Sequence, residues 1–508
     1  MDEVGARIAR GSFWLSTGQV LSTVIAFAGS IIIARLLGPD QYGIVGVALI
    51  FPGILPGVLD LGLSYALVRY VHLDRENRYI PTAFTYKLIT AILSAGILLF
   101  FADNLSYILA RPYIAPYLRI LAIYVFGIIV LESVKAVLTG HGEYHKVVVI
   151  DSVRSLLRII VSIILIIVGL GVYGAVSAFS IGVLATLILV PKLVVGKNLH
   201  VRFDREAFKE LLIYSIPLYL PLLLGIPLRN IVQIVLANYA TNTQLGWYSV
   251  ALNLVIPLNV IGVSLITSMF STLPMLLDNR EKMNRVVVKA TLYTSIITLP
   301  LAFGLIAFSR PIIYMVYGEE YLPASIYLSI LATHGLLAPL GLYILRPYFN
   351  SVGATKNSFK MSIVRLSFYL PLGILAIIYT GITGFLVVHV VSDLFSALYG
   401  LRLLRREFGV NIVYWRNMMI LVSLGVPALI AAVLTYLLPI GMIIKTIVAL
   451  IVYLAAVLII IGHQLKIEEI RELKMLSYNI KVIGTVIAAI FDVMEKLNRK
   501  TRCLLRRG

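Results

Sequence analysis

The sequence predicts an all-α integral membrane protein with about 14 transmembrane helices. First, 60% of its 508 residues are apolar, only 13% are charged, and the mean hydropathy is +0.96. Second, apolar stretches of about 18 residues or more recur along the chain, each long enough to cross a hydrocarbon core of about 30 Å. Third, basic residues gather in alternate short loops, as they do in multi-pass membrane proteins.

The expected spans follow the apolar runs in order. Their cores are 12–35, 43–70, 82–102, 115–139, 147–168, 172–195, 210–238, 247–277, 288–308, 322–349, 361–379, 382–401, 416–437 and 441–462. Only a glycine turn separates two spans at Gly171 and again at Gly381.

The second span contains several helix breakers. A turn at Gly38–Tyr42 precedes it, and Asp60 lies inside it. The breakers within it are Pro52, Gly53, Pro56, Gly57 and Gly62. Each proline frees a carbonyl that hydrocarbon cannot satisfy, which favours a helix that bends against protein or water. Proline and glycine are also commoner in membrane helices generally, so both interpretations stay open.

The basic loops set the expected orientation. One side carries Arg7, Arg10, Arg75, Arg78, Lys146, Lys192, Lys197, Arg202, Arg205, Lys209, Arg280, Lys282, Arg285, Lys289, Lys356, Lys360, Arg402, Arg405, Arg406 and Arg416. The other side has only Arg35, Arg111, Arg119, Arg310 and Lys445. The positive-inside rule then places both termini in the cytoplasm. It also accounts for most of the formal charge of +19 without a nucleic-acid partner.

An internal repeat predicts two pseudo-symmetric six-helix lobes in the same orientation. GEYHKVVVIDSVRSLLR matches GATKNSFKMSIVRLSFY, which aligns Gly142 with Gly353 and Arg154 with Arg365. YGIVGVA likewise matches LGWYSVA, and GVYG matches GITG. The expected divisions are lobes at 1–198 and 199–408, two further helices at 409–462, and a basic cytoplasmic tail at 463–508.

The tail mixes charges and ends in KLNRKTRCLLRRG. Its apolar piece Val482–Phe491 is too short to span a bilayer. Binding to anionic headgroups of membrane lipids and a solvated tail are both open. The single cysteine, Cys503, excludes disulfides within one chain.

No enzyme motif is present: there is no P-loop, HExxH, nucleophile elbow or CxxC pair. His141 and His145 have i, i+4 spacing but lie in a glycine-containing loop, and we expect no metal and no cofactor. The informative residues are ionisable groups inside spans, which are costly in hydrocarbon. They are Asp60, Lys87, Glu132, Lys135, Asp151, Arg154, Arg158, Arg229, Arg346, Arg365 and Asp393.

Some of these groups can pair along one helix face, as Glu132 with Lys135 or Asp151 with Arg154. Arg158 and Arg229 have no acid within a helical turn. Inside the spans, basic side chains outnumber acidic ones, and guanidinium forms bidentate pairs with phosphate. The net positive charge therefore favours an anionic cargo.

The turn ARLLGPDQYG, followed by FPGILPGVLDLGLSYALVRY, resembles the polysaccharide flippase family, of the superfamily that also holds drug-extrusion transporters and lipid II flippases. The resemblance implies a flippase that moves a polyprenyl-(pyro)phosphate-linked oligosaccharide across the cytoplasmic membrane by alternating access. It also implies a cavity lined by the first two helices of each lobe. The candidate substrate-binding residues are Arg229, Asn230, Gln233, Asp60, Arg69 and Arg158. The second copy of the turn, YATNTQLGWY, lacks the Gly-Pro pair, and the helix after it has no acid where Asp60 lies.

Three alternatives remain at this point. A small-molecule exporter coupled to Na⁺ or H⁺ would need cation-binding acids, for which only Asp60 is available on the cavity helices. A membrane glycosyltransferase would need a large outer loop, and the outer loops are short. A purely structural protein would not need so many buried charges. We expect a monomer whose partners are membrane lipids and the lipid-linked oligosaccharide.

Overall fold

The structure is a computed structural model that describes residues 3–73, 77–193, 199–270, 280–412, 415–437, 441–465 and 467–478, with Asp492 and Glu495. Every regular element within these residues is a helix, which confirms the all-α prediction. The chain forms two compact units, each described below by itself. Unit 1 comprises Met1–Val250 and Ile377–Ile382, and unit 2 comprises Ala251–Ala376 and Thr383–Gly508. The limits of the predicted lobes stay a prediction.

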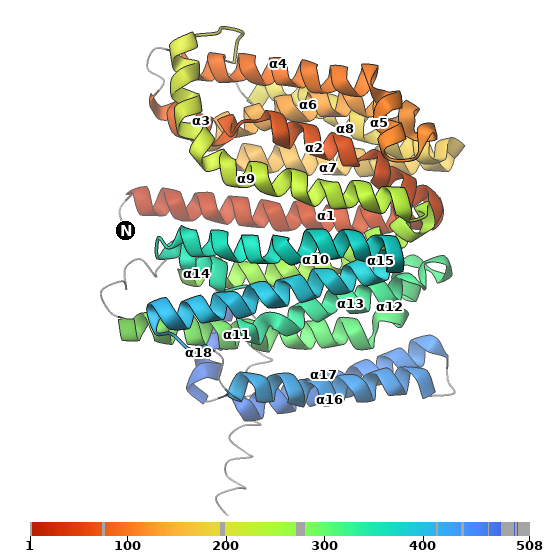
Figure 1. Cartoon of the computed structure of the whole chain (residues 1–508), viewed down its shortest axis with the longest axis vertical. Helices are drawn as coiled ribbons and strands as arrows, with labels where there is room; N and C mark the ends of the chain where they lie inside the picture. Colours follow the sequence, from red (N-terminus) through yellow and green to blue (C-terminus); the bar gives the residue numbers. More distant parts are fainter. Residues whose placement is uncertain are drawn as a thin grey trace, which may run out of the picture. The chain divides into compact units, whose positions relative to one another are not determined.

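Unit 1 is a bundle of long helices (Figure 1) in which α4 packs on α6 and α7 lies beside α8. Its elements are α1 (Glu3–Ala48), α2 (Ile50–Leu59), α3 (Leu63–Tyr70), η1 (Val71–Leu73), α4 (Tyr79–Phe100), α5 (Ala102–Ile108), η2 (Pro112–Ile114), α6 (Ala115–Gly140), α7 (Tyr144–Leu165), η3 (Ile166–Leu170), α8 (Gly171–Leu193), α9 (Arg205–Tyr239) and the start of α10 (Asn242–Phe270).

Unit 2 holds the rest of α10 and a second set of helices, in which α16 lies beside α17. Its further elements are α11 (Arg280–Ala307), α12 (Ser309–Tyr317), η5 (Glu319–Tyr321), α13 (Ala324–Ala332), η6 (Thr333–Leu340), α14 (Leu345–Ser351), α15 (Thr355–Phe408), α16 (Trp415–Leu437), α17 (Met442–Gln464) and α18 (Ile467–Tyr478). The apolar tail piece Val482–Phe491 lies outside the described residues.

Glycines break three stretches that are too long to be single spans. These stretches cover 38, 47 and 54 residues, and as a straight helix even the shortest would reach about 57 Å against a core of about 30 Å. The backbone leaves helical geometry at Gly38 (φ 73°), Gly171 (φ 48°) and Gly381 (φ 68°), which confirms the predicted glycine turns. Phe368 stacks on Phe395 at 4.5 Å between ring centroids, so the two arms of α15 lie against each other.

Eight helices among the described residues are long and apolar enough to span a membrane, or nine if the bent pair Ala324–Leu340 and Leu345–Ser351 counts as one span. The multi-span membrane class is therefore confirmed. The number of about 14 helices stays a prediction.

Burial is distributed as expected for a protein in lipid. Small hydroxyl side chains of α11, such as Thr291 and Ser295, are buried, and each donates to the carbonyl four residues earlier. Large apolar side chains of α16 point outward, with Val422 70% and Leu429 69% exposed. Hydrocarbon solvates such side chains, so the exposed apolar faces mark the lipid-facing surface.

The start of α9 is fixed by Asp204, which precedes its first residue. The carboxylate accepts hydrogen bonds from the backbone N–H groups of Glu206 at 2.9 Å and Ala207 at 3.0 Å. These bonds, with that from Ala207 the largest cause, hold the pKa of Asp204 below its usual value. Asp204 thus satisfies donors that every helix N-terminus leaves free.

Candidate functional site

The predicted bend in the second span is a complete break between α2 and α3. Asp60 ends α2, and Leu61 (φ 49°) and Gly62 (φ 76°) follow in the left-handed region. A Cβ at position 62 would lie 2.8 Å from Cβ of Tyr219 and 3.0 Å from the carbonyl oxygen of Ser215, so only glycine fits there without a shift. The interpretation that these breakers are merely common in membrane helices is wrong for this position.

Two tyrosines satisfy carbonyls that the break leaves without helical partners. Tyr86 on α4 donates to the carbonyl of Leu59 at 3.1 Å, and Tyr219 on α9 donates to that of Gly57. An unsatisfied carbonyl in hydrocarbon costs several kcal/mol. Protein hydroxyls therefore replace the water that a break in a soluble helix would use.

The carboxylate at this break is neutralised by a lysine from the neighbouring helix. Lys87 on α4 forms an ion pair with Asp60 and donates to Oγ of Ser64 at 2.8 Å. Ser64 in turn donates to Oδ1 of Asp60 at 2.9 Å. The side chain of Lys87 is only 4% exposed and that of Asp60 17%. Asp60 is therefore the buried counter-ion of Lys87.

Further charged side chains continue from this pair onto α6 and α7. Lys135 on α6 binds Glu132 at 2.9 Å and Asp151 on α7 at 3.0 Å. Asp151 also contacts Arg154 at 3.7 Å, and α6 packs on α4, the helix that carries Lys87. We call Asp60, Lys87, Glu132, Lys135, Asp151, Arg154 and Arg158 the charged row. The sequence prediction of local Glu132–Lys135 and Asp151–Arg154 pairs is confirmed, with Lys135 also joining the two helices.

The charged row carries an excess of positive charge, because it contains four basic and three acidic side chains. Arg158 lies at its end on α7, and its guanidinium stacks over the ring of Phe179 at 4.8 Å. A guanidinium that lies over an aromatic ring contacts it with its flat face. Its N–H donors lie in the guanidinium plane and can still bind an oxyanion. Each acid of the row already contacts a base, so the row can bind one further anionic group and become neutral.

The other candidate residues of the first helices fall on two elements. Arg69, in the last turn of α3, is exposed and stacks over Tyr214 at 4.4 Å. Asn230 on α9 is buried at 4% exposure, and Gln233 one turn later is half-buried. Arg229 belongs to α9, but its side chain lies outside the described residues.

The two glycines of the predicted repeat share a backbone conformation. Gly142 has φ 75° and Gly353 has φ 77°, and each lies two residues before the start of a helix, α7 or α15. Arg154 and Arg365 lie at the same position counted from those helix starts. The superposition of the two segments stays a prediction.

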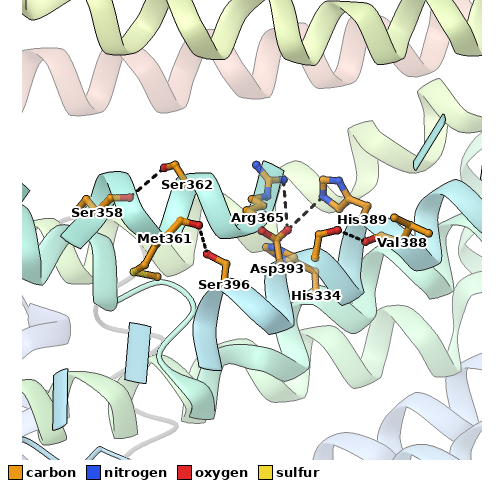
Figure 2. Close-up of polar contacts among 10 residues, drawn as sticks. His334, Ser358, Met361, Ser362, Arg365, Val388, His389, Asp393 and Ser396 are labelled. Atoms are coloured by element: carbon orange, nitrogen blue, oxygen red, sulfur yellow. Dashed lines mark hydrogen bonds and ion pairs between the residues drawn. The ribbon is translucent and has the colours of Figure 1, made fainter. Parts of the chain in front are cut away.

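Two partners of Asp393 could not be predicted from the sequence. Besides Arg365, with Nε 2.6 Å from Oδ1, His334 and His389 contact this carboxylate in unit 2 (Figure 2). The i, i+4 spacing of His389 and Asp393 was a readable signal for one face of one helix. His334 lies on η6, and nothing in the sequence links it to Asp393.

Comparison with known proteins identifies the family. Residues 32–326, more than half of the chain, match the family described as "Polysaccharide biosynthesis protein". The chain belongs to this family. The matched segment contains the helix break and the entire charged row.

Curated relatives extend the match over most of the chain. The chain is 24% identical over 372 residues to the succinoglycan biosynthesis transport protein ExoT of Rhizobium meliloti, covering 70% of this chain and 72% of that protein. It is 19% identical over 409 residues to the lipopolysaccharide biosynthesis protein WzxC of Escherichia coli, covering 76% and 79%.

Solved structures agree on the fold. The inward closed conformation of the lipid II flippase MurJ has a TM-score of 0.71 at 16% identity and covers 87% of this chain and 97% of its own. An inward-facing multidrug resistance MATE transporter has a TM-score of 0.64 at 19% identity, with 76% and 94% covered. At these identities the likeness concerns the fold alone.

Proposed function

We propose that this protein flips a polyprenyl-(pyro)phosphate-linked oligosaccharide across the cell membrane by alternating access. The family concerns polysaccharide biosynthesis, and ExoT is named as a transport protein of that process. The protein is a transporter and not an enzyme. The observation that carries the proposal is the charged row inside the membrane helices of the family-matched segment.

The charged row suits a phosphate-bearing cargo for an electrostatic reason. A charge inside hydrocarbon costs roughly 3 kcal/mol or more unless something compensates it. All three acids of the row contact lysine or arginine, and the excess positive charge is left for a group that enters from outside. A phosphate supplies the missing negative charge and fits the planar fork of arginine.

The proposed contact residues are Arg229, Asn230, Gln233, Arg69 and Arg158, with Asp60 as the counter-ion of Lys87. Arg229 lies beside Asn230 on α9, the helix whose Tyr219 donates to the carbonyl of Gly57 in the last turns of α2, just before the break. We propose that Arg229 binds the phosphate or pyrophosphate and that Asn230 or Gln233 assists with amide hydrogen bonds. A guanidinium offers the phosphate both a positive charge and directed hydrogen bonds, whereas an amide offers directed hydrogen bonds without a charge.

The state of Asp60 argues against the second candidate function, a cation-coupled small-molecule exporter. Asp60 is the acid on the cavity helices that a coupling cation would need, and Lys87 already neutralises it. A Na⁺ ion would have to displace a buried ammonium group, which leaves that charge uncompensated. The likeness to the MATE transporter concerns the fold and does not restore this function.

Three finer points belong to the same proposal. Both termini lie in the cytoplasm, because the basic loops alternate in that sense. The protein acts as a monomer among membrane lipids. If an ion drives transport, H⁺ or Na⁺ acts at a group other than the Asp60–Lys87 pair.

The proposal is tested with purified protein in proteoliposomes. A fluorescent polyprenyl-pyrophosphate-linked sugar in the outer leaflet should become inaccessible to a membrane-impermeant reagent only in vesicles that contain the protein. A cationic dye loaded into matched vesicles should not be exported. Dye export without movement of the lipid-linked sugar would replace the proposal with the exporter function.

A further inference from the structure

Three side chains of unit 2 converge on a single point that the proposed function does not use. His334 comes from η6, and His389 and Asp393 come from the second arm of α15. We call these three residues the His–Asp cluster, and Figure 2 shows their side chains turned toward one another. Asp393 is buried at 6% exposure, and both histidines are half-buried. The cluster lies beyond the family-matched residues 32–326.

The ligand atoms of the cluster have nearly the spacing of a metal site. Nε2 of His334 lies 3.1 Å and Nε2 of His389 3.6 Å from the same oxygen, Oδ2 of Asp393. All three atoms lie within 4.8 Å of one another. Tetrahedral ligands about 2.0–2.1 Å from a metal are separated by about 3.4 Å. The two nitrogen–oxygen distances bracket that value, so small shifts of the side chains would bring the three ligand atoms to the spacing of a metal site.

Neighbouring side chains hold the cluster in this arrangement. The guanidinium of Arg365 binds both carboxylate oxygens, Oδ1 through Nε at 2.6 Å and Oδ2 through Nη2 at 3.4 Å, and so fixes the plane of the carboxylate beside the imidazoles. Tyr343 packs edge-on against His334, and Tyr369 against His389, at 6.0 and 5.6 Å between ring centroids. Hydrogen bonds to a ligating carboxylate, such as those from Arg365, fix its orientation in metal sites, and the packed rings restrict rotation of the imidazoles.

We propose that the His–Asp cluster is a site for one divalent transition-metal ion of the Zn²⁺ or Co²⁺ class, bound by two imidazole nitrogens and one carboxylate oxygen. Imidazole suits these ions, whereas Na⁺, Mg²⁺ and Ca²⁺ are hard cations that prefer oxygen ligands. Three protein ligands leave a fourth position for water. The ion joins η6 to the second arm of α15 within unit 2. This inference goes beyond the proposed function and does not depend on it.

The test is Co²⁺ binding by the full-length protein without a histidine tag, in detergent. Tetrahedral Co²⁺ gives visible d–d absorption, and the titration should saturate at one ion per chain and be reversed by Zn²⁺. Bound Co²⁺ should also raise the midpoint of thermal unfolding, because it binds the folded state. Na⁺ or Mg²⁺ in excess should not compete.

Two variants and a matched control separate the cluster from other histidines. His334→Ala and His389→Gln should each weaken Co²⁺ binding at least about tenfold. The glutamine still reaches Asp393 with an amide, so the fold keeps a hydrogen-bonding group there. The control His141→Ala/His145→Ala removes another i, i+4 histidine pair and should bind Co²⁺ like the unaltered protein.

Two results would overturn the site. One is the lack of a saturable Co²⁺ signal at one ion per chain in the unaltered protein. The other is a folded His389→Gln variant, judged by gel filtration and its unfolding midpoint, that binds Co²⁺ as tightly as the unaltered protein. In either case Asp393 serves only as the counter-ion of Arg365.

Discussion

Lys87 on α4 is ion-paired with Asp60, the residue at which α2 breaks off before α3. The pair places a neutralised carboxylate at the point where the helical backbone is interrupted. Because Ser64 bridges the two groups, the break is held by side chains of α3 and α4 together. Removal of either charge should therefore destabilise the packing of α3 and α4 around the break.

Lys87→Gln should destabilise the protein by about 3 kcal/mol, because breaking a buried pair leaves an uncompensated charge. The double variant Asp60→Asn/Lys87→Gln should recover part of the loss. Arg285→Gln is the matched control, since Arg285 and Glu281 form a pair that is 68% and 78% exposed. That variant should lose less than about 1 kcal/mol. Thermal unfolding in detergent measures all three, and equal losses in Lys87→Gln and the control would contradict a buried pair.

Gly62→Ala should lower the unfolding midpoint clearly, because Gly62 has a positive φ and its Cβ would meet Tyr219 and Ser215. Gly53→Ala is the control, since no atom lies within 4 Å of a Cβ at that helical position. We expect Gly53→Ala to be neutral or to stabilise by about 0.5–1 kcal/mol. A folded Gly62→Ala variant with an unchanged midpoint would show that the break does not need glycine.

The sequence predicted the places where helices break better than it predicted their partners. A turn at a glycine depends on the sequence next to it and not on distant contacts. Gly171 and Gly381 could therefore be recognised as turns from their position between apolar runs. The pairing of Asp60 with Lys87 depends on which helices pack together, and apolar periodicity in a lipid-facing bundle does not specify that. The same holds for His334, which reaches Asp393 from a different element.

The orientation prediction concerns the loops around Lys197 and Asp278. Reporter fusions after either residue should behave as cytoplasmic, because the basic residues nearby favour that side. A cytoplasmically active reporter and one active only outside should be tested at each position. An outside location at either residue would overturn the topology and, with it, the placement of both termini.

Arg229→Lys should retain part of the transport, whereas Arg229→Gln should lose most of it at the same protein level in the membrane. Lysine keeps the positive charge that we propose for phosphate binding but not the bidentate geometry. Gln233→Ala serves for comparison, because loss of an amide should reduce transport less than loss of the charge. Full transport by Arg229→Gln would exclude Arg229 from binding the cargo.

The most direct test of the central claim, recognition of a phosphate-linked lipid cargo, compares two lipids that differ only in the phosphate. The same fluorescent oligosaccharide is attached to polyprenyl pyrophosphate or, through an uncharged linkage, to the polyprenol, and flipping is measured in proteoliposomes. We predict that the protein flips the pyrophosphate-linked form and leaves the uncharged form at the rate of empty vesicles. Equal flipping of both lipids would contradict the role given to the charged row.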